Sequence, residues 1–434
     1  MEKQVELGVE ITNRQSNWQI VKDLSSNFVG ALSGNMFAYG LGLMLLDQTH
    51  LALSFGIDMI VTPLVGLACL VPVGNLVDRH RHKLILNCSI SVRLLALLIF
   101  ALTIDLFHGM AKLLPVILFL IVNAFSVNVS NSAYMASVHE LVNNGKIQKL
   151  SSLVQAAASL ALILSPAVGT ALYSATNFDT FIYVEIGATL ITALILQTMH
   201  FHYAPVEQKS VRGERTVQSQ WQGFMEGLSY MKGRGLLKGM ITAAVVINFI
   251  FTSETIGLPF VIKEQLNFGN GPVGFLNSAF SLGMLVGSVA LSIFSKSNNL
   301  KTRLLIPLVI LGFEFGLLGL TLMWVKNPSQ LDLFGSIITA AFGITLTIVN
   351  ITCGVRIQQT VPTKLLGRVS SLLMMAVTIV DPLGTLFYTF IFQNTSSGSV
   401  IFVINGIVML AYIVFMTPLF LKWIGAEEKF MSEE

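Results

Sequence analysis

The sequence predicts an all-α integral membrane protein with twelve transmembrane helices in two pseudo-repeats of six. The 434 residues are 53% hydrophobic and 11% charged, whereas a soluble domain carries about 25% charged residues. Because so few charges cannot cover a folded surface that faces water, the outer surface must contact lipid. Long apolar runs predict the number of helices, and the placement of the basic residues predicts how the helices are oriented in the membrane.

Twelve apolar runs are each long enough to cross a membrane as a helix. Inside lipid, only α-helices and closed β-barrels satisfy all their backbone hydrogen bonds. Continuous apolar runs without strict alternation of apolar and polar residues favour helices over a barrel. The expected spans lie at residues 26–47, 52–76, 84–105, 113–138, 151–173, 179–200, 238–260, 272–294, 304–325, 332–353, 369–392 and 399–422.

The basic residues support an even number of spans. With the amino terminus placed inside, 22 of the 26 Lys and Arg residues fall in inner segments and three in outer segments, while Arg93 lies within a span. This asymmetry follows the positive-inside rule with both termini in the cytosol. The first 25 residues also lack the basic, apolar and small-residue regions of a signal peptide.

The longest polar stretch, residues 201–237, divides the chain into two halves of six spans. Apolar residues within it, such as Trp221, Phe224 and Leu228, recur at helical spacing and predict an amphipathic helix on the inner surface. We therefore expect five parts: a cytosolic amino-terminal segment (1–25), a six-helix bundle (26–200), a cytosolic linker with an amphipathic helix (201–237), a second six-helix bundle (238–422) and a cytosolic tail (423–434).

A proline-containing phrase recurs in corresponding spans of the two halves. The fifth span contains Ser165-Pro166 and the eleventh contains Asp381-Pro382, each followed shortly by a Gly-Thr pair. Paired helices interrupted by glycine and proline are typical of transporters that arose by duplication and bind their substrate between the halves. The repeat therefore indicates transport.

The loop after the second span carries the sharpest local motif. Residues 74–83 read GNLVDRHRHK, which resembles the loop signature of the major facilitator superfamily, Gly-x-x-x-Asp-Arg-x-Gly-Arg-Lys. The match holds at Gly74, Asp78, Arg79 and Lys83. The resemblance implies the major facilitator fold and a role for this loop in gating.

In that role Asp78 would pair with groups on a neighbouring helix and lock the inner gate. A carboxylate close to a helix N-terminus and to arginine is electrostatically favoured. The chain departs from the signature at Arg81, where the family usually has glycine, and at His82, where it usually has arginine. A basic loop that serves only to orient the protein is the alternative interpretation.

The fifth span resembles the antiporter signature of exporters in the same superfamily, Gly-x-x-x-Gly-Pro-x-x-Gly-Gly. Ser165, Pro166 and Gly169 occupy the central positions, although three of the four glycines are replaced. Small residues let two helices approach closely, and proline bends a helix. Any tightly packed helix pair could use the same residues, so a purely structural role is the alternative.

Further phrases, at 258–260, 273–287 and 358–362, make the chain similar to the branch that contains macrolide-efflux-type proteins. The resemblance implies a secondary transporter that exports small hydrophobic or amphipathic compounds, including antibiotics, by proton antiport with alternating access. Transport of a specific metabolite, siderophore or lysolipid is the alternative within transporters. A polytopic sensor without transport is the alternative from another class.

The same interpretation sets the expected surroundings of the protein. We expect a monomeric, multi-pass protein of a bacterial cytoplasmic membrane, whose partners are a small apolar substrate, protons and the lipid bilayer. The sequence has no phosphate-binding loop and no recognisable catalytic cluster, so we expect neither an enzyme nor an ATP-driven pump. We expect no cofactor, no metal and no nucleic acid.

Acidic residues within the spans are the candidates for ion coupling. Ionisable groups at membrane depth are costly and are therefore functional candidates. In the superfamily, spans one, four, seven and ten line the cavity, so the resemblance places Glu254, in span seven, first. Asp58 and Asp381, in spans two and eleven, come next. A structural hydrogen bond or ion pair is the alternative for Glu254.

Three other charged residues are expected to be structural. Arg93 needs an acidic group or carbonyl groups nearby, because it is the only basic residue inside a span. The resemblance places Glu185 and Glu314 on bracing helices. We expect these three residues to contact neighbouring helices through ion pairs or hydrogen bonds.

The fourth span is unusually polar for the middle of a membrane. Asn123, Ser130 and Tyr134 lie mostly on one stripe, which Asn131 extends. Such a stripe can line a water-filled cavity or bind two helices together. With Phe249 from the seventh span, whose ring could adapt to varied apolar ligands, these residues form the predicted substrate cavity.

Overall fold

The computed structural model describes residues 11–202, 233–293, 300–361 and 363–433, together with 225 and 228–231. Within this part the chain is helical and has no strand. It forms two compact units: unit 1 consists of Met1–Thr49 and Ile57–Arg212, and unit 2 of His50–Gly56 and Gly213–Glu434. The division follows the two halves of the sequence, except for the short segment after the first helix.

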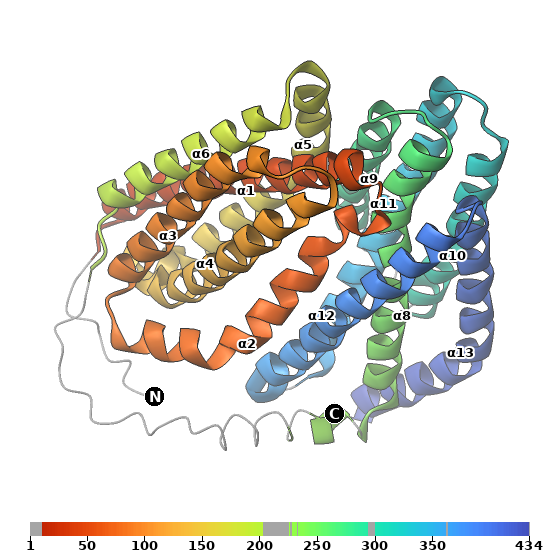
Figure 1. Ribbon diagram of the computed structural model, residues 1–434. Coiled ribbons are helices and arrows are strands. Elements are labelled where there is room, and N and C mark those ends of the chain that lie inside the picture. The colour runs from red at the N-terminus through yellow and green to blue at the C-terminus, as the bar shows by residue number, and fades with distance from the viewer. Residues whose placement is uncertain are drawn as a thin grey trace. The chain divides into compact units, whose positions relative to one another are not determined.

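Unit 1 contains six long helices in its described part. Figure 1 shows α1 beside α5 and α6, while α4 packs against α2 and α3. These helices are α1 (Asn13–Thr49), α2 (Ile57–Arg79), α3 (His82–Thr103), α4 (Leu113–Leu141), α5 (Ile147–Ala175) and α6 (Phe178–Thr198). The short 3₁₀ helices of this unit are η2 (Ile104–Leu106), η3 (Gly109–Lys112) and η4 (Asn144–Lys146).

Aromatic side chains form the centre of unit 1. Phe37 of α1 contacts Phe100 of α3, Phe119 of α4 and Phe178 of α6, with ring centroids 6.1, 5.4 and 5.7 Å apart. All four residues are buried. Because lipid tails are as apolar as these rings, close packing rather than escape from water holds the helices together.

Unit 2 also contains six long helices in its described part. In Figure 1, α8 lies beside α12, and the closest helix pairs are α9 with α11 and α10 with α13. The helices are α8 (Gly235–Phe260), α9 (Gly271–Ile293), α10 (Leu300–Trp324), α11 (Pro328–Thr360), α12 (Thr363–Asn394) and α13 (Ser399–Glu433). The unit also contains the 3₁₀ helix η1 (Ala52–Phe55) and the π-helix η5 (Val261–Gln265).

Glycines allow α9 and α11 to pack at backbone contact. A Cβ atom added to Gly283 would lie 2.0 Å from the carbonyl oxygen of Ala340, and one added to Gly343 would lie 2.0 Å from that of Phe280. Only glycine permits so close an approach. This is the small-residue packing that joins helices within membranes.

Eleven helices in the described part of the chain are long and apolar enough to cross a membrane. The second predicted span, 52–76, overlaps α2, a 23-residue helix whose apolar part among these residues, Ile57–Cys69, is shorter. The first residues of the predicted span form η1 of unit 2 and were wrongly assigned to the span. Large apolar side chains such as Leu102, Val414 and Phe415 are exposed to 78%, 75% and 74%. An exposed apolar surface of this kind suits lipid, and the predicted all-α membrane fold is confirmed.

The first helix is longer than the sequence predicted. It begins at Asn13, whereas the expected span begins at residue 26. The additional turns are held by polar contacts at and just after the end of α6, because Lys22 Nζ donates to the Thr198 carbonyl at 2.7 Å and Gln19 Nε2 to the His200 carbonyl at 3.1 Å. Of the predicted amphipathic linker helix, most residues lie outside the described part.

Replacing Gly283 with alanine should destabilise the protein by about 1 to 3 kcal/mol, the usual cost of overpacking. The clash with the Ala340 carbonyl outweighs the ~1 kcal/mol that alanine gains over glycine in a helix. Thermal unfolding of the purified protein in detergent measures the difference. Gly271→Ala is the matched control, since nothing lies within 4 Å of its added Cβ. Equal unfolding temperatures for the Gly283 variant and the wild type would contradict this packing.

Candidate functional site

Glu254 is a buried carboxyl group of unit 2 that has no hydrogen-bonding or ionic partner among the described residues. It lies in the second half of α8, and only 8% of its surface is exposed. Among the described residues no side chain donates a hydrogen bond to its carboxyl group, and none of the ion pairs includes it. Burying an ionised carboxylate without a counter-charge is costly. This position is therefore the strongest candidate in unit 2 for exchanging a proton.

A chain of hydrogen bonds lies next to Glu254 along α8. Asn405 of α13 donates from Nδ2 to Ser253 Oγ at 2.8 Å, and Tyr388 of α12 donates to Asn405 Oδ1 at 3.0 Å. Phe249, just over one helical turn before Glu254, packs on Tyr388 with ring centroids 5.4 Å apart. These contacts join α8, α12 and α13 at Ser253, the residue before Glu254 on α8.

Asp381 lies on α12, which packs directly on α8. A Cβ atom added to Gly384, three residues further along α12, would lie 2.8 Å from Thr252 Oγ1 of α8. Asp381 itself is half-buried and precedes Pro382 within the helix. The structure thus brings the helices that carry Glu254 and Asp381 together, whereas the third predicted coupling residue belongs to unit 1.

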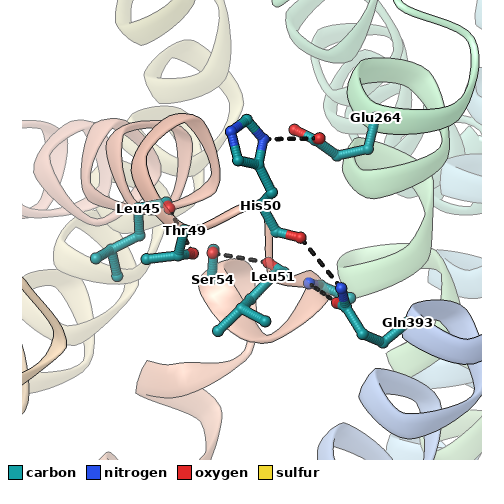
Figure 2. A network of polar contacts seen from close by, with 8 residues as sticks. Leu45, Thr49, His50, Leu51, Ser54, Glu264 and Gln393 are labelled. Atoms are coloured by element: carbon teal, nitrogen blue, oxygen red, sulfur yellow. Dashed lines mark hydrogen bonds and ion pairs between the residues drawn. The ribbon is translucent and has the colours of Figure 1, made fainter. Parts of the chain in front are cut away.

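The segment His50–Gly56 packs on α8 and α12 of unit 2 (Figure 2). Gln393 of α12 holds its backbone twice, because Oε1 accepts from the Ala52 N–H at 3.0 Å and Nε2 donates to the His50 carbonyl at 3.3 Å. The Nδ1 atom of His50 lies 2.8 Å from Glu264 Oε2 of the π-helix η5. No sequence signal indicated that the loop after the first helix belongs to the second unit.

In unit 1 the predicted polar stripe of α4 points toward several neighbours. Ser130 Oγ lies 2.6 Å from Ser89 Oγ of α3. Asn123 Oδ1 is buried without a hydrogen-bond partner in the described part, and Asn131 is exposed. Tyr134 faces α1. Two residues of the stripe, Ser130 and Tyr134, therefore contact neighbouring helices. The role of the stripe in substrate binding stays a prediction.

The partner of Tyr134 is Asp23, which the sequence analysis did not select. Tyr134 Oη donates to Asp23 Oδ2 at 2.5 Å, and Asn27 Nδ2 donates to Asp23 Oδ1 at 3.1 Å. Asp23 is 3% exposed. Because Asp23 precedes the first apolar run, it was expected to lie in the cytosolic segment (1–25). The spacing of Asp23 and Asn27, one helical turn apart, is the signal that could have identified it.

The three residues expected to be structural all contact neighbouring helices. Arg93 of α3 forms an ion pair with Glu185 of α6, and their side chains are 24% and 2% exposed. Glu314 of α10 accepts a hydrogen bond from Thr345 Oγ1 of α11 at 2.9 Å. Arg93 and Glu185 thus neutralise each other within unit 1, while Glu314 contacts a neutral donor in unit 2.

The predicted gating loop is only partly described. Lys83, at the start of α3, donates from Nζ to two backbone carbonyls at the end of α6, at 3.0 and 2.7 Å. The side chains of Gly74, Asp78 and Arg79 lie outside the described residues. The predicted lock at Asp78 therefore stays a prediction.

One departure from the superfamily signature has a partner in the structure. His82, at the first position of α3, places Nδ1 2.8 Å from Glu140 Oε1 near the end of α4. The contact is an ion pair when the imidazole is protonated. It joins the beginning of one span to the end of the next within unit 1.

Asp58 lies in the first turn of α2, where Oδ1 accepts a hydrogen bond from Thr62 Oγ1 at 2.7 Å. A helix N-terminus stabilises an acidic side chain, so Asp58 stabilises the start of this span. Its proposed role in coupling has no further contact to support it.

The antiporter-like phrase lies where α5 packs on α1. Ser165 Oγ approaches the Leu32 carbonyl of α1 at 3.2 Å. A Cβ atom added to Gly169 would lie 3.3 Å from the ring of Tyr39, and Pro166 lies inside α5. The small residues of the phrase thus allow two helices of unit 1 to approach closely. In the described part of the chain, no three metal-ligating side chains come together.

A helical protein of this kind, with long apolar helices in two units and carboxyl groups buried within them, is a polytopic membrane transporter. The family model of the Major Facilitator Superfamily matches residues 24–385, so the chain belongs to this superfamily. The resemblance inferred from the loop motif is thereby confirmed.

Two groups of curated relatives cover most of the chain. The enterobactin exporter EntS of Shigella boydii is 22% identical over 354 residues, which cover 80% of this chain and 79% of the exporter. Macrolide efflux protein A of Enterococcus faecalis is 25% identical over 320 residues, which cover 72% of this chain and 93% of the efflux protein.

Solved transporter structures share the fold at low sequence identity. The nucleoside transporter NupG matches with a TM-score of 0.69 at 12% identity, covering 94% of this chain and 99% of that chain. A bacterial homologue of the human lysosomal transporter Spinster matches with a TM-score of 0.66 at 11% identity, covering 98% and 99%. These similarities establish the architecture.

Replacing Arg93 with methionine should destabilise the protein by about 3 kcal/mol, because it leaves the buried Glu185 carboxylate without its counter-charge. The double variant Arg93→Met with Glu185→Leu should recover most of this loss, since two apolar side chains replace the whole pair. Thermal unfolding in detergent compares the three proteins. A double variant no more stable than Arg93→Met alone would show that the charges do not compensate each other.

Proposed function

We propose that the protein exports small hydrophobic or amphipathic compounds by proton antiport, and that Glu254 carries the proton. The observation that carries this proposal is the burial of Glu254 in α8 without a partner among the described residues. An ionisable group at membrane depth is costly and is a functional candidate for that reason. Asp381, on the adjoining helix α12, is the second candidate for the same step.

The membrane potential can supply the energy for coupling to a monovalent cation such as a proton. One elementary charge that crosses the membrane releases about 2.3 kcal/mol per 100 mV. A single proton that binds to a buried carboxyl group on one side and leaves on the other can therefore drive the alternation between outward-open and inward-open states. Substrate would leave the cell in the opposite direction.

The substrate class and the direction are supported by the relatives. One group is named for macrolide efflux and the other for enterobactin export, and both names describe outward movement of a compound. Efflux of apolar drugs is the function proposed here. Export of a specific siderophore is the second candidate, supported by the similarity to the enterobactin exporter over 80% of the chain.

The proposed orientation places both termini and the 201–237 linker in the cytosol of a bacterial cell, with the chain acting as a monomer in the cytoplasmic membrane. The distribution of basic residues supports it, because inner segments hold 22 of 26. In this orientation Asp78, Arg79 and Lys83 lie on the inner side, where they would form the gate. The five-part domain division belongs to the same proposal.

A susceptibility screen of cells with and without the gene tests the function. Cells that express the protein should tolerate higher concentrations of erythromycin, ethidium or other amphipathic toxicants than cells that lack it. Enterobactin secretion measured in the same cells distinguishes the siderophore alternative. Unchanged tolerance to the whole panel, together with unchanged secretion, would reject export and favour a sensor.

Replacing Glu254 with glutamine should reduce resistance to that of cells without the gene, while the protein still reaches the membrane. Glutamine keeps the shape of the side chain but cannot exchange a proton. Glu314→Gln is the matched control, because this buried carboxyl group on α10 already accepts a hydrogen bond from Thr345. The control should retain resistance. Resistance that persists in Glu254→Gln would remove Glu254 from the mechanism.

A further inference from the structure

Asp23 of unit 1 is a buried carboxyl group that the proposed function does not use. Asp23 of α1 is 3% exposed, and both of its carboxyl oxygens are engaged. Oδ2 accepts from Tyr134 Oη of α4 at 2.5 Å, and Oδ1 accepts from Asn27 Nδ2 at 3.1 Å. An O–H···O distance of about 2.5 to 2.7 Å is typical of a hydrogen bond to an ionised acceptor.

No positive charge balances this carboxylate within the described residues. None of the ion pairs there includes Asp23. Its two donors are a neutral phenol and a neutral amide. A buried charge that is held only by neutral donors gains little in return for leaving water. The carboxyl group of Asp23 is therefore a candidate for taking up one positive charge.

The charged groups around Asp23 are directed elsewhere. Lys22 donates to the carbonyl of Thr198, the last residue of α6, and Lys146 donates to the Asn13 carbonyl at 3.2 Å. On α4, His139 is exposed and Glu140 contacts His82; on α5, Lys149 is exposed. Deeper in the unit, Arg93 pairs with Glu185. None of these contacts brings a basic side chain to Asp23, which leaves a proton from water as the positive charge that we consider.

The hydrogen bond also joins two helices of unit 1. The backbone of α1 runs closer to α5 and α6 than to α4. Helices α1 and α4 contact each other through apolar side chains such as Phe37 and Phe119, and the Tyr134–Asp23 contact adds a polar tie between them. Tyr134 is half-buried, so the hydrogen-bonded pair extends from the buried carboxyl group to the surface of unit 1.

We propose that Asp23 is a second proton-binding group of the transport cycle, and that its protonation loosens the hydrogen bond that ties α1 to α4. The proton adds to a carboxylate oxygen from water and leaves to water, while the Tyr134 O–H bond stays intact. A hydrogen bond to a neutral acceptor is weaker than one to a carboxylate. Proton binding in unit 1 is thereby converted into a change in the contact between two spans. The inference rests on the proposed proton antiport.

Infrared difference spectra between alkaline and acidic pH test proton binding directly on the wild-type protein in lipid. A protonated carboxyl group gives a C=O stretching band that a carboxylate lacks. This band should weaken in Asp23→Asn by the contribution of one group. In Tyr134→Phe it should appear at a higher pH, because loss of the donor destabilises the ionised form and tightens proton binding about tenfold or more.

The matched control is Tyr173→Phe, which removes the same kind of contact, a phenol that donates to Asp47 Oδ2 at 2.6 Å, from an exposed carboxylate. This variant should leave the pH dependence of the band unchanged. A band of equal intensity in the wild type and Asp23→Asn would overturn the proposal, as would a shift in Tyr173→Phe equal to that in Tyr134→Phe. A merely structural hydrogen bond predicts no loss of the band in Asp23→Asn.

Transport of ethidium by reconstituted vesicles separates this inference from the proposed function. Asp23→Asn should equilibrate ethidium down its own gradient but lose accumulation driven by an imposed pH gradient. Gradient-driven accumulation that persists in Asp23→Asn, and is lost in Glu254→Gln, would overturn the role of Asp23 and leave proton antiport intact. A wild type that ignores the pH gradient would overturn proton antiport, and with it the coupling role of Asp23.

Discussion

Lipid offers no water to replace a missing hydrogen bond, and this constraint determines both the fold and the sites of the protein. Backbone groups within the membrane must bond to one another, which a helix achieves within each span. The same constraint acts on the side chains. A carboxyl group within these helices is costly unless it has a hydrogen-bonding or ionic partner or takes up a proton. The few acidic residues of the spans are therefore the strongest candidates for structural or coupling roles.

Three of the buried carboxyl groups on the described helices meet this constraint in different ways. Glu185 is neutralised by Arg93 of a neighbouring helix and is fixed in place. Asp23 is held by the neutral donors Tyr134 and Asn27. Glu254 has no partner among the described residues. The counter-charge of Arg93 explains a structural role for Glu185, whereas exchange of a proton needs a carboxyl group without a counter-charge. Asp23 and Glu254 meet that condition among the described residues. Glu314 of α10 meets it too, because its donor is the neutral Thr345 hydroxyl, so the Glu314→Gln variant tests whether burial without a counter-charge is sufficient for coupling.

Much of the fold follows from the sequence because hydropathy and charge act locally. Apolar runs predicted the spans, and the basic residues predicted an even number of them. Asp23 was missed because hydropathy placed the start of the first span beyond it, although α1 begins at Asn13. Its partner Tyr134 is 111 residues away, and no local pattern reports such a contact. The packing of His50–Gly56 on unit 2 was unpredictable for the same reason.

The central claim is that outward movement of an apolar compound is exchanged for inward movement of protons. Everted membrane vesicles with an acidic interior and an acridine dye that reports their pH test it directly. Adding erythromycin or ethidium should release protons from vesicles that contain the protein and leave vesicles without it unchanged. The account would be contradicted if both kinds of vesicle kept the same interior pH while the compound still accumulated.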